Sequence, residues 1–434
     1  MPKRLEQKIR TKRARIAVLG LGYVGLPLAV NFARCGFQVY GLDKDQDRVN
    51  RILEKKSYIA DITTRELAAV VSSRRLMATT DFSVLKDMDV MIICVPTPLK
   101  RKYTPDVSYI TSAVRSMKKY LTRGALVVME STTYPGTTRE LIKPELEKSG
   151  LKAGKDFFLA FSPERIDPGN KTFDVTRIPK VVGGLTPVCA RLTKALYRKI
   201  IKEVHVVSSP EAAEMTKLLE NSFRIINIGW INEVAMMAHE LGIDVWEVIE
   251  AARTKPFGFM PFYPGLGVGG HCIPDDPLYL YWKARRYGFS SRYIKLSADT
   301  NSHMPAYVVD RIAKNLRKKN RPLSSARILV VGVTYKKDVK DLRRSPALKL
   351  IHLLQAEAKG VEYFDPVIPY LEIFDIHQKV SIDLTPKNLK TYDCIVIATD
   401  HTHVDYDLIL RHAKMIFDTR NVYAGRSSQK IERI

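Results

Sequence analysis

A single cysteine, Cys272, stands in a segment that is suited to chemistry. Residues 265–270 contain four glycines, and Asp276 follows the cysteine by four positions. Glycine lets a backbone pass close to a bulky ligand, and a cysteine presented there can act as a nucleophile. The alternative is a tight turn beside a buried, inert thiol, because unpaired cysteines are among the most buried residue types. The rest of the sequence has to decide between these two interpretations.

Length and composition indicate a globular protein of two or three domains. The chain has 434 residues, 45% of them hydrophobic, and its five cysteines lack the paired spacing of a disulfide framework or a zinc site. We therefore expect a reducing, cytoplasmic compartment. No apolar run reaches the roughly 18 residues that span a bilayer, so no membrane insertion is expected. The basic segment 1–15 lacks the apolar stretch of a signal peptide and is predicted to be a solvated tail.

The net charge of +24 could attract nucleic acid, an acidic membrane surface or an anionic small molecule. The basic residues are spread along the chain rather than gathered in one stripe, and no nucleic-acid-binding motif accompanies them. We therefore favour a solvated surface that attracts an anionic substrate, and we expect no nucleic-acid partner.

Residues 1–210 are predicted to form a doubly wound α/β domain. Short β-branched apolar runs alternate with helical stretches, which is typical of a parallel sheet covered on both faces. The predicted strands are 16–19, 39–42, 90–95, 126–129, 158–161 and 180–182.

The chain changes character after residue 210. Residues 211–241 show helical spacing of apolar residues without a proline, which predicts one long helix. Its exposed apolar positions suit a homodimer interface. A second helix is predicted over 247–253, followed by a Gly/Pro/aromatic loop over 256–277 and a helix from Pro277 onward. Residues 211–314 would thus form a central helical region.

Residues 315–434 are predicted to form a second, smaller α/β domain. Its polar and basic opening run, 315–325, has the composition of a linker. The fold class that we expect is therefore α/β, with two Rossmann-like doubly wound domains joined by a central helical region. The predicted strands of the second domain are 327–333, 361–364, 394–398 and 415–418, with a helix over 346–356.

The first predicted strand leads into a dinucleotide-binding fingerprint. Gly20, Gly22 and Gly25 form the pattern G-x-G-x-x-G, followed by a helical segment. The first glycine makes a tight turn, the second lets a pyrophosphate approach, and the third lets helix and strand pack closely. Asp43 ends the next strand, 23 residues after Gly20, and suits a ribose hydroxyl. This acid favours NAD over NADP, whereas Arg48 could oppose that preference.

Two further strand ends are expected at the same crevice, because ligands of open α/β sheets bind at the carboxyl ends of the strands. One follows the predicted strand 90–95 and the other follows 126–129. Cys94 lies inside its strand and is interpreted as a packed core thiol. The further cofactor contacts expected in the fingerprint and at these strand ends are Tyr23, Val24, Val95, Pro96, Thr97 and Thr132.

A nicotinamide site supplies Cys272 with an oxidant. A thiolate can attack an aldehyde, and loss of hydride to NAD then gives a thioester that water hydrolyses. Lys217 and Asn221 are four residues apart on the predicted long helix, so they share a face from which they could stabilise an oxyanion. Asp276 could orient Lys217 or accept a proton through water.

Glu164 follows another predicted strand and could act as the general base of thioester hydrolysis. His271 is a less favoured partner for the neighbouring Cys272, because adjacent side chains usually point apart. Each charged residue taken alone could equally be an ordinary surface group.

Taken together, the motifs resemble the UDP-glucose/GDP-mannose dehydrogenase family over residues 13–425. The resemblance implies an NAD-dependent, four-electron oxidation of a nucleotide-sugar primary alcohol to a carboxylate, using two NAD. It also implies an N-terminal NAD domain, a central dimerisation region and a C-terminal nucleotide-binding domain. The matching segments are 20–29, 94–98, 130–136, 162–169, 214–221, 265–277 and 335–346.

The resemblance also implies roles for individual residues. Arg343 would contact the cofactor. The residues implied at the reacting centre are Cys272 as the nucleophile, with Lys217, Asn221, Asp276, Glu164 and Thr133. The substrate contacts expected in the matching segments are Glu164, Arg165, Lys217, Asn221, Tyr263, Gly265, Gly269, Tyr335, Lys336 and Arg420.

The loop 255–265 and the Gly-His-Cys-Ile-Pro segment after it look most like enzymes that act on UDP-N-acetylglucosamine. Enzymes for UDP-N-acetylmannosamine share parts of both motifs, so that substrate stays open, and UDP-glucose is less favoured. A rival of another class is a non-catalytic protein that binds NAD and a nucleotide sugar, and the presence of Cys272, Lys217 and Asp276 argues against it.

Three positions depart from the family pattern. Many UDP-glucose members carry a lysine where this chain has Asp275, and a glutamate where it has Pro168. Both departures bear on the choice of sugar. In the family's Asp-x-Arg-Glu-Ser pattern this chain has Arg344 in place of the acid, which changes the local charge balance.

Overall fold

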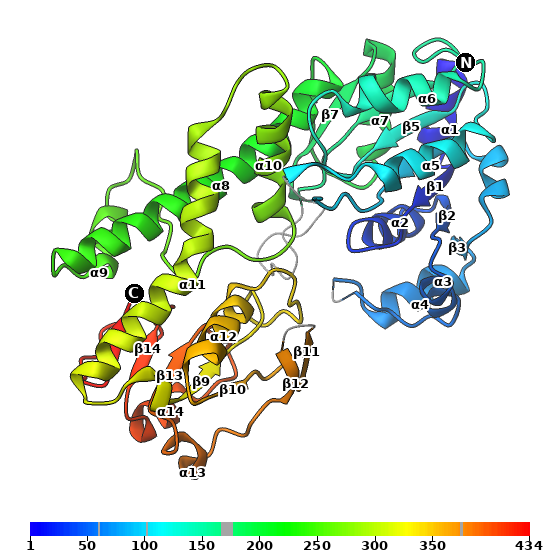
Figure 1. Cartoon of the computed structure of the whole chain (residues 1–434). Coiled ribbons are helices and arrows are strands. Elements are labelled where there is room, and N and C mark those ends of the chain that lie inside the picture. Colours follow the sequence, from blue (N-terminus) through cyan, green and yellow to red (C-terminus); the bar gives the residue numbers. More distant parts are fainter. Residues whose placement is uncertain (60, 101–102, 166–176, 374–375) are drawn as a thin grey trace. The chain divides into compact units, whose positions relative to one another are not determined.

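The computed structural model of the chain divides into two compact units (Figure 1). The first comprises residues 1–220 and 282–289, and the second comprises 221–281 and 290–434. The structure describes the chain except residues 60, 101–102, 166–176 and 374–375, and the side chains of 373–378. The position of Pro168 therefore lies outside the described residues.

An eight-stranded sheet forms the centre of the first unit, in the order β3-β2-β1-β4-β5-β6-β7-β8. The sequence analysis missed β3 and β8. It was also wrong that all strands are parallel, because β7 runs antiparallel to β6. The strands are β1 (Arg15–Leu19), β2 (Gln38–Leu42), β3 (Leu76–Thr79), β4 (Val90–Ile93), β5 (Leu126–Met129), β6 (Phe158–Phe161), β7 (Lys180–Gly184) and β8 (Val204–Val207).

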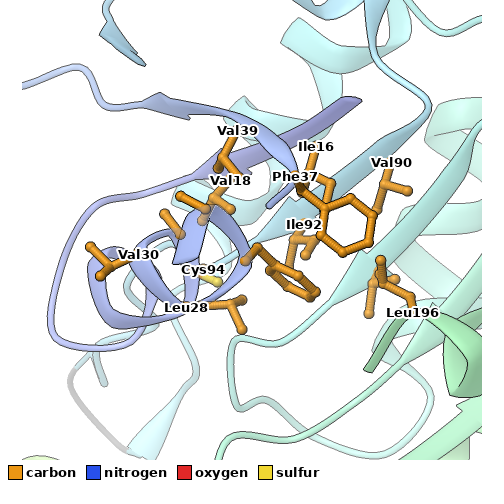
Figure 2. Packing of buried hydrophobic residues seen from close by; sticks show 14 of the residues in the cluster. Ile16, Val18, Leu28, Val30, Phe37, Val39, Val90, Ile92, Cys94 and Leu196 are labelled. Carbon is orange, nitrogen blue, oxygen red and sulfur yellow. The ribbon is translucent and has the colours of Figure 1, made fainter. Parts of the chain in front are cut away.

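Both faces of this sheet are buried, as a doubly wound fold requires. Along β4, Val90 and Ile92 enter one hydrophobic cluster, whereas Met91 and Ile93 enter a second cluster. Figure 2 shows the first cluster, to which Val90 and Ile92 belong together with Leu28 and Phe37. The helices of the unit are α2 (Gly25–Arg34), α3 (Gln46–Leu53), α4 (Thr64–Ser72), α5 (Ser108–Lys118), α6 (Lys143–Glu147) and α7 (Pro187–Tyr197).

The basic N-terminal segment is not a solvated tail, so that expectation was wrong. Residues Pro2–Arg10 form helix α1, which packs against α7. Leu5 and Ile9 are one turn apart and both are buried in the first cluster. Lys8 forms an ion pair of 2.5 Å with Asp89. Two aliphatic side chains at helical spacing are enough to dock this short helix despite its charge.

The second unit contains a five-stranded parallel sheet in the order β10-β9-β13-β14-β15. The four predicted strands and the predicted helix are confirmed, and the last strand was missed, as was a two-stranded ribbon, β11–β12. These elements are β9 (Arg327–Val331), β10 (Gly360–Phe364), β11 (Tyr370–Ile373), β12 (Ile376–Val380), β13 (Cys394–Ile397), β14 (Ile416–Asp418), β15 (Ile431–Arg433), α12 (Pro346–Glu357), α13 (Pro386–Leu389) and α14 (Tyr406–His412).

Long helices account for most of the chain between the two sheets. The predicted long helix is confirmed as α8 (Pro210–Glu240), of 31 residues, and is followed by α9 (Val245–Arg253). Helix α10 begins at Cys272 and ends at Arg285, so the predicted loop is shorter than expected. Helix α11 (Arg292–Lys318) takes in the start of the expected linker.

The cause of the early start of α10 is local. Pro277 was read as the first residue of a helix, but it lies inside α10. The residues from Cys272 onward therefore belong to the helix as well, although a proline at this position removes one backbone hydrogen bond of the helix. As a result Cys272 and Asp276 lie one turn apart on one helix rather than on a glycine-rich turn.

No helix in the described part of the chain is long and apolar enough to cross a membrane.

Candidate functional site

The fingerprint glycines of the first unit show the close packing that their pattern predicts. Gly20 has φ of +92°, and a Cβ on it would lie 2.6 Å from the carbonyl oxygen of Cys94. A Cβ on Gly25 would lie 1.8 Å from the carbonyl oxygen of Gly20. Neither position can carry a side chain, so the strand and helix α2 meet with only backbone between them.

Gly22 differs from its neighbours in the motif. A Cβ on this residue would meet nothing within 4 Å, so open space faces the backbone at the start of α2. This is the space into which the pyrophosphate of a dinucleotide would enter, against the N-terminal end of a helix. Tyr23 is exposed beside it, at 46% of its surface. The residues present therefore fit NAD.

Asp43 is held at the fingerprint loop, as the spacing predicts. Its Oδ2 accepts the backbone N–H of Leu21 at 2.8 Å, and its Oδ1 accepts that of Asp45 at 3.0 Å. Arg48 contacts Oδ2 at 3.3 Å. The arginine thus pairs with Asp43, and the two expected cofactor contacts form one group at the end of β2.

The ends of β4 and β5 also lie together. The Thr97 hydroxyl donates to the carbonyl oxygen of Thr132 at 2.8 Å. The next residue, Thr133, is buried and shares a short hydrogen bond with the hydroxyl of Thr137. Cys94 is buried, and burial raises the pKa of its thiol, so the interpretation as a packed core thiol is confirmed.

The sequence analysis missed Glu214, which organises the loop that carries Thr133. Its carboxylate, on α8, accepts the backbone N–H groups of Gly136 at 2.6 Å and Thr138 at 2.9 Å, and the Thr138 hydroxyl at 2.7 Å. Burial raises the pKa of Glu214 to about 7 although these three donors oppose the shift. The signal was available, because Glu214 opens one of the matching segments.

Glu164 lies just after β6, and both of its carboxylate oxygens accept hydrogen bonds. Oε1 accepts the backbone N–H of Arg165 at 2.7 Å, and Oε2 accepts the ammonium of Lys180 at 3.2 Å. The Arg165 guanidinium is turned to Glu220 at 2.6 Å and to the carbonyl oxygen of Pro179 at 2.6 Å. Lys180 is a second residue that the sequence analysis missed.

In the second unit, Cys272 is the first residue of α10, and Asp276 follows it by one turn. The partial positive charge of a helix N-terminus stabilises negative charge on a group placed there. Asn221 of α8 donates to Asp276 Oδ2 at 2.6 Å, and both side chains are buried. Asp276, proposed as a partner of Lys217, thus contacts Asn221. Lys217 precedes Asn221 by one turn of α8 and is 9% exposed.

Two of the departures from the family pattern form an ion pair. The guanidinium of Arg344 lies 2.6 Å from Asp275, whose side chain is 1% exposed. Arg344 adopts φ of +49°, a conformation that costs a non-glycine residue free energy. Burial raises the pKa of Asp275 to about 6, and the nearby cation opposes the shift. His271 also lies 3.9 Å from Asp275. Compared with the family pattern, the charges at positions 275 and 344 are both reversed, so an acid and a cation still face each other.

The glycine-rich segment before Cys272 packs against residues of the second unit that are expected to contact the substrate. A Cβ on Gly269 would lie 2.4 Å from that of Tyr335, and one on Gly265 would lie 3.1 Å from Nη1 of Arg420. The backbone N–H of Gly265 donates to Oδ1 of Asn232 at 2.9 Å. The close approach at Gly269 leaves no room for a side chain, and two expected substrate contacts, Tyr335 and Arg420, lie against these glycines.

Three other expected contacts have neighbours of their own. The Tyr263 hydroxyl donates to Glu250 at 2.8 Å and its ring stacks on that of Trp246. Arg343 forms a two-pronged ion pair with Asp341, with the shorter contact at 2.6 Å. The carbonyl oxygen of Lys336 accepts the Thr334 hydroxyl at 3.0 Å. These contacts describe how the side chains and backbone are held, and the ligand roles stay predictions.

Comparison with known proteins identifies the family. The NAD-binding domain of the UDP-glucose/GDP-mannose dehydrogenase family matches residues 14–201, its central domain matches 211–303, and its UDP-binding domain matches 329–425. The chain belongs to this family. As a member of the UDP-glucose/GDP-mannose dehydrogenases it is an enzyme that uses NAD, and its C-terminal domain is the family's UDP-binding domain.

Relatives within the family differ in their sugar. The chain is 38% identical over 416 residues to the UDP-N-acetyl-D-mannosamine dehydrogenase of Pyrococcus horikoshii, covering 94% of this chain and 96% of the relative. It is also 38% identical over 393 residues to a UDP-N-acetyl-D-glucosamine 6-dehydrogenase of Pseudomonas aeruginosa, covering 90% and 91%. Its fold matches the solved structure of the Pyrococcus enzyme with a TM-score of 0.88 at 37% identity, covering 97% of this chain and 99% of that one.

Proposed function

We propose that the protein oxidises the C6 alcohol of UDP-N-acetylglucosamine to the carboxylate in two NAD-dependent steps. The observation that carries the proposal is the placement of Cys272 at the N-terminus of α10, one turn before the Asp276–Asn221 pair. Bound NAD supplies a hydride acceptor for each step. The first oxidation converts the alcohol to an aldehyde and releases one proton.

Cys272 then carries the second half of the reaction. Its thiolate adds to the aldehyde carbon, and the resulting alkoxide takes a proton to give a thiohemiacetal. Loss of hydride and of the hydroxyl proton gives a thioester, and attack of water on the thioester releases the acid and the thiolate. The sugar therefore loses four electrons, and the cysteine returns to its starting state.

Other residues of the chain stabilise charge and move protons in this scheme. Lys217 and Asn221 stabilise the alkoxide that forms on the sugar, since both project from α8 at one-turn spacing. Glu164 takes the proton of the attacking water, and Thr133 positions that water with its hydroxyl. Tyr335, Lys336 and Arg420 belong to the expected UDP site, with Gly265, Gly269, Tyr263 and Arg165 as further substrate contacts and Arg343 as a cofactor contact.

The rival substrate is UDP-N-acetylmannosamine, which the name of the Pyrococcus horikoshii relative favours. Purified enzyme incubated with NAD and a panel of UDP-sugars distinguishes the candidates. We expect about two NADH per sugar consumed, with the highest kcat/KM on UDP-N-acetylglucosamine, because each sugar passes through two hydride transfers. A higher kcat/KM on UDP-N-acetylmannosamine transfers the assignment to that sugar. One NADH per sugar contradicts the thioester mechanism.

We also propose that α8 mediates a homodimer. Leu219, Phe223, Trp230 and Met237 are exposed at helical spacing, and Trp230 is 56% exposed. Several large exposed apolar side chains on one face of a helix are typical of an interface. We expect Trp230→Glu to convert the protein to monomer at micromolar concentration, measured by size-exclusion chromatography with light scattering. Leu53→Glu is the matched control, since Leu53 is 51% exposed on α3. An unchanged mass for Trp230→Glu contradicts the proposed interface.

The compartment that suits this chemistry is the cytoplasm. None of the five cysteines forms a disulfide, and the proposed nucleophile must stay reduced to react.

A further inference from the structure

A cluster of charged side chains is buried in the first unit, at the edge of the sheet where Glu164 lies. The ammonium of Lys180 is 2.7 Å from Glu130 Oε2 and 3.2 Å from Glu164 Oε2. The side chain of Lys180 is 6% exposed and that of Glu130 is 0% exposed. Lys180 thus bridges a fully enclosed carboxylate and the carboxylate proposed to act on water.

The direction of β7 explains how Lys180 comes to this edge. Ala160 and Phe161 of β6 pair with Gly184 and Gly183 of the antiparallel β7. Extending that register by three residues places Glu164 opposite Lys180. A parallel strand would deliver its first residue to the other edge of the sheet, so the reversal of β7 is what brings the cation to the carboxyl ends of β5 and β6.

The environment of Lys180 keeps its ammonium charged and in place. Burial alone disfavours the charge, but Glu130 and Glu164 together raise the pKa of Lys180 above its ordinary value. The Tyr197 hydroxyl donates to Glu130 Oε1, and the ammonium lies 5.2 Å from the centre of the Tyr197 ring. Contacts with Glu130, Glu164 and the Tyr197 ring therefore hold the Lys180 ammonium in one position beside the Glu164 carboxylate.

A buried charged cluster of this kind is not explained by its contribution to the stability of the fold. Removing charges from water costs several kcal/mol per ion, and a buried ion pair is often no more stabilising than packed apolar side chains. Two carboxylates on one ammonium also leave the cluster with a net negative charge. This excess suits a site in which one of the carboxylates has to remain an anion that can accept a proton.

We propose that Lys180 is a positioning residue for thioester hydrolysis, holding the Glu164 carboxylate ionised and fixed so that it can take a proton from water. The inference rests on the proposed function, in which Glu164 is the general base. In that step the hydroxide of the water bonds to the thioester carbon, the proton goes to Glu164, and the thiolate of Cys272 leaves. Lys180 and Glu130 themselves exchange no proton.

Other groups also face this cluster. Glu130 follows β5, Tyr197 belongs to α7, and the buried thiol of Cys94 follows β4. Arg165 is adjacent to Glu164, but its guanidinium is engaged with Glu220 of α8 at 2.6 Å. Lys180 therefore supplies a cationic contact to the Glu164 carboxylate, and Glu130 supplies the like charge.

The test uses the opposite signs of these two neighbours. In Lys180→Met the loss of a cation disfavours the anion of Glu164, so the acid limb of the kcat–pH profile should move up by about one unit or more. In Glu130→Gln the loss of a like charge favours the anion, so the limb should stay or move down. Lys180→Arg keeps the charge and should restore most of the profile. Lys118→Met, which breaks a partly buried lysine–glutamate pair with Glu145 outside the cluster, should leave the profile unchanged.

The double variant Lys180→Met/Glu130→Gln separates positioning from folding. It removes the buried pair as a unit, so stability should recover relative to Lys180→Met, and its acid limb should lie between those of the two single variants because these shift the pKa of Glu164 in opposite directions. A limb that stays at the wild-type position in Lys180→Met overturns the proposal, as does a limb that survives Glu164→Gln. The carbon-13 shift of the Glu164 carboxyl, assigned by comparison with Glu164→Gln, follows the same titration without turnover. Absence of NADH with every sugar would therefore reject the proposed function alone, and this second readout would still test Lys180.

Discussion

Replacing Cys272 with serine should lower kcat by at least about a thousandfold while leaving the affinity for NAD within about twofold of wild type. A serine hydroxyl is a far weaker nucleophile at neutral pH and cannot form the thioester. The glycines and Asp43 that fit NAD lie in the other unit of the chain, so cofactor binding has no reason to change. Stopped-flow NADH absorbance gives the rate, and the quenching of intrinsic fluorescence by NAD gives the affinity.

The matched control is Cys35→Ser. Cys35 is partly buried, its thiol donates to the carbonyl oxygen of Lys199, and the proposed reaction assigns it no role. This variant should retain wild-type kcat. Near-normal turnover by Cys272→Ser would remove the covalent mechanism, and loss of NAD binding in the same variant would show that the effect is on folding rather than on chemistry.

Arg344→Glu should lower the free energy of unfolding by about 3 kcal/mol, which is the low end for a broken buried pair because Arg344 is half exposed. The substitution places a carboxylate against Asp275, which is 1% exposed and has its pKa raised to about 6 by burial. The neighbouring turn carries Cys272, so kcat should fall as well. Urea denaturation followed by circular dichroism measures the first effect, and NADH production measures the second.

The reversed pair Asp275→Lys/Arg344→Glu tests whether the two positions act together. It restores opposite charges in the order that the family pattern carries, so it should recover more than half of the stability lost in Arg344→Glu. Lys337→Glu, at a pair of 3.6 Å with Asp400 whose side chains are 47% and 38% exposed, is the control and should cost less than about 1 kcal/mol. Additive losses in the double variant would show that Asp275 and Arg344 are independent.

Much of the first sheet and the cofactor site could be predicted because the signals are local. A β-branched run predicts a strand and G-x-G-x-x-G predicts the turn after it. Gly20 and Gly25 accordingly pack as closely as the motif requires, and Asp43 lies against the fingerprint loop. The NAD cofactor and the family followed from the same motifs. The start of α10 was placed too late because a proline inside the helix was taken for its first residue.

Features that depend on partners distant in sequence were missed. The sequence of Lys180–Gly184 does not indicate that this strand is antiparallel to β6. Without the antiparallel direction, Lys180 would not contact Glu164. The departures Asp275 and Arg344 were noted separately, and only their contact makes them one reversed pair. The N-terminal helix is a case of the same kind, since its burial depends on packing against helix α7, which is distant in sequence.

The distribution of the five cysteines has a practical consequence for studying the enzyme. Cys94, Cys189 and Cys394 are buried and Cys35 is partly buried, whereas Cys272 is exposed at the head of α10. A mild electrophile added in slight excess would therefore alkylate one position ahead of the others. Such a reagent would count functional active sites in a preparation, and the same selectivity makes this exposed thiol a target for covalent inhibitors.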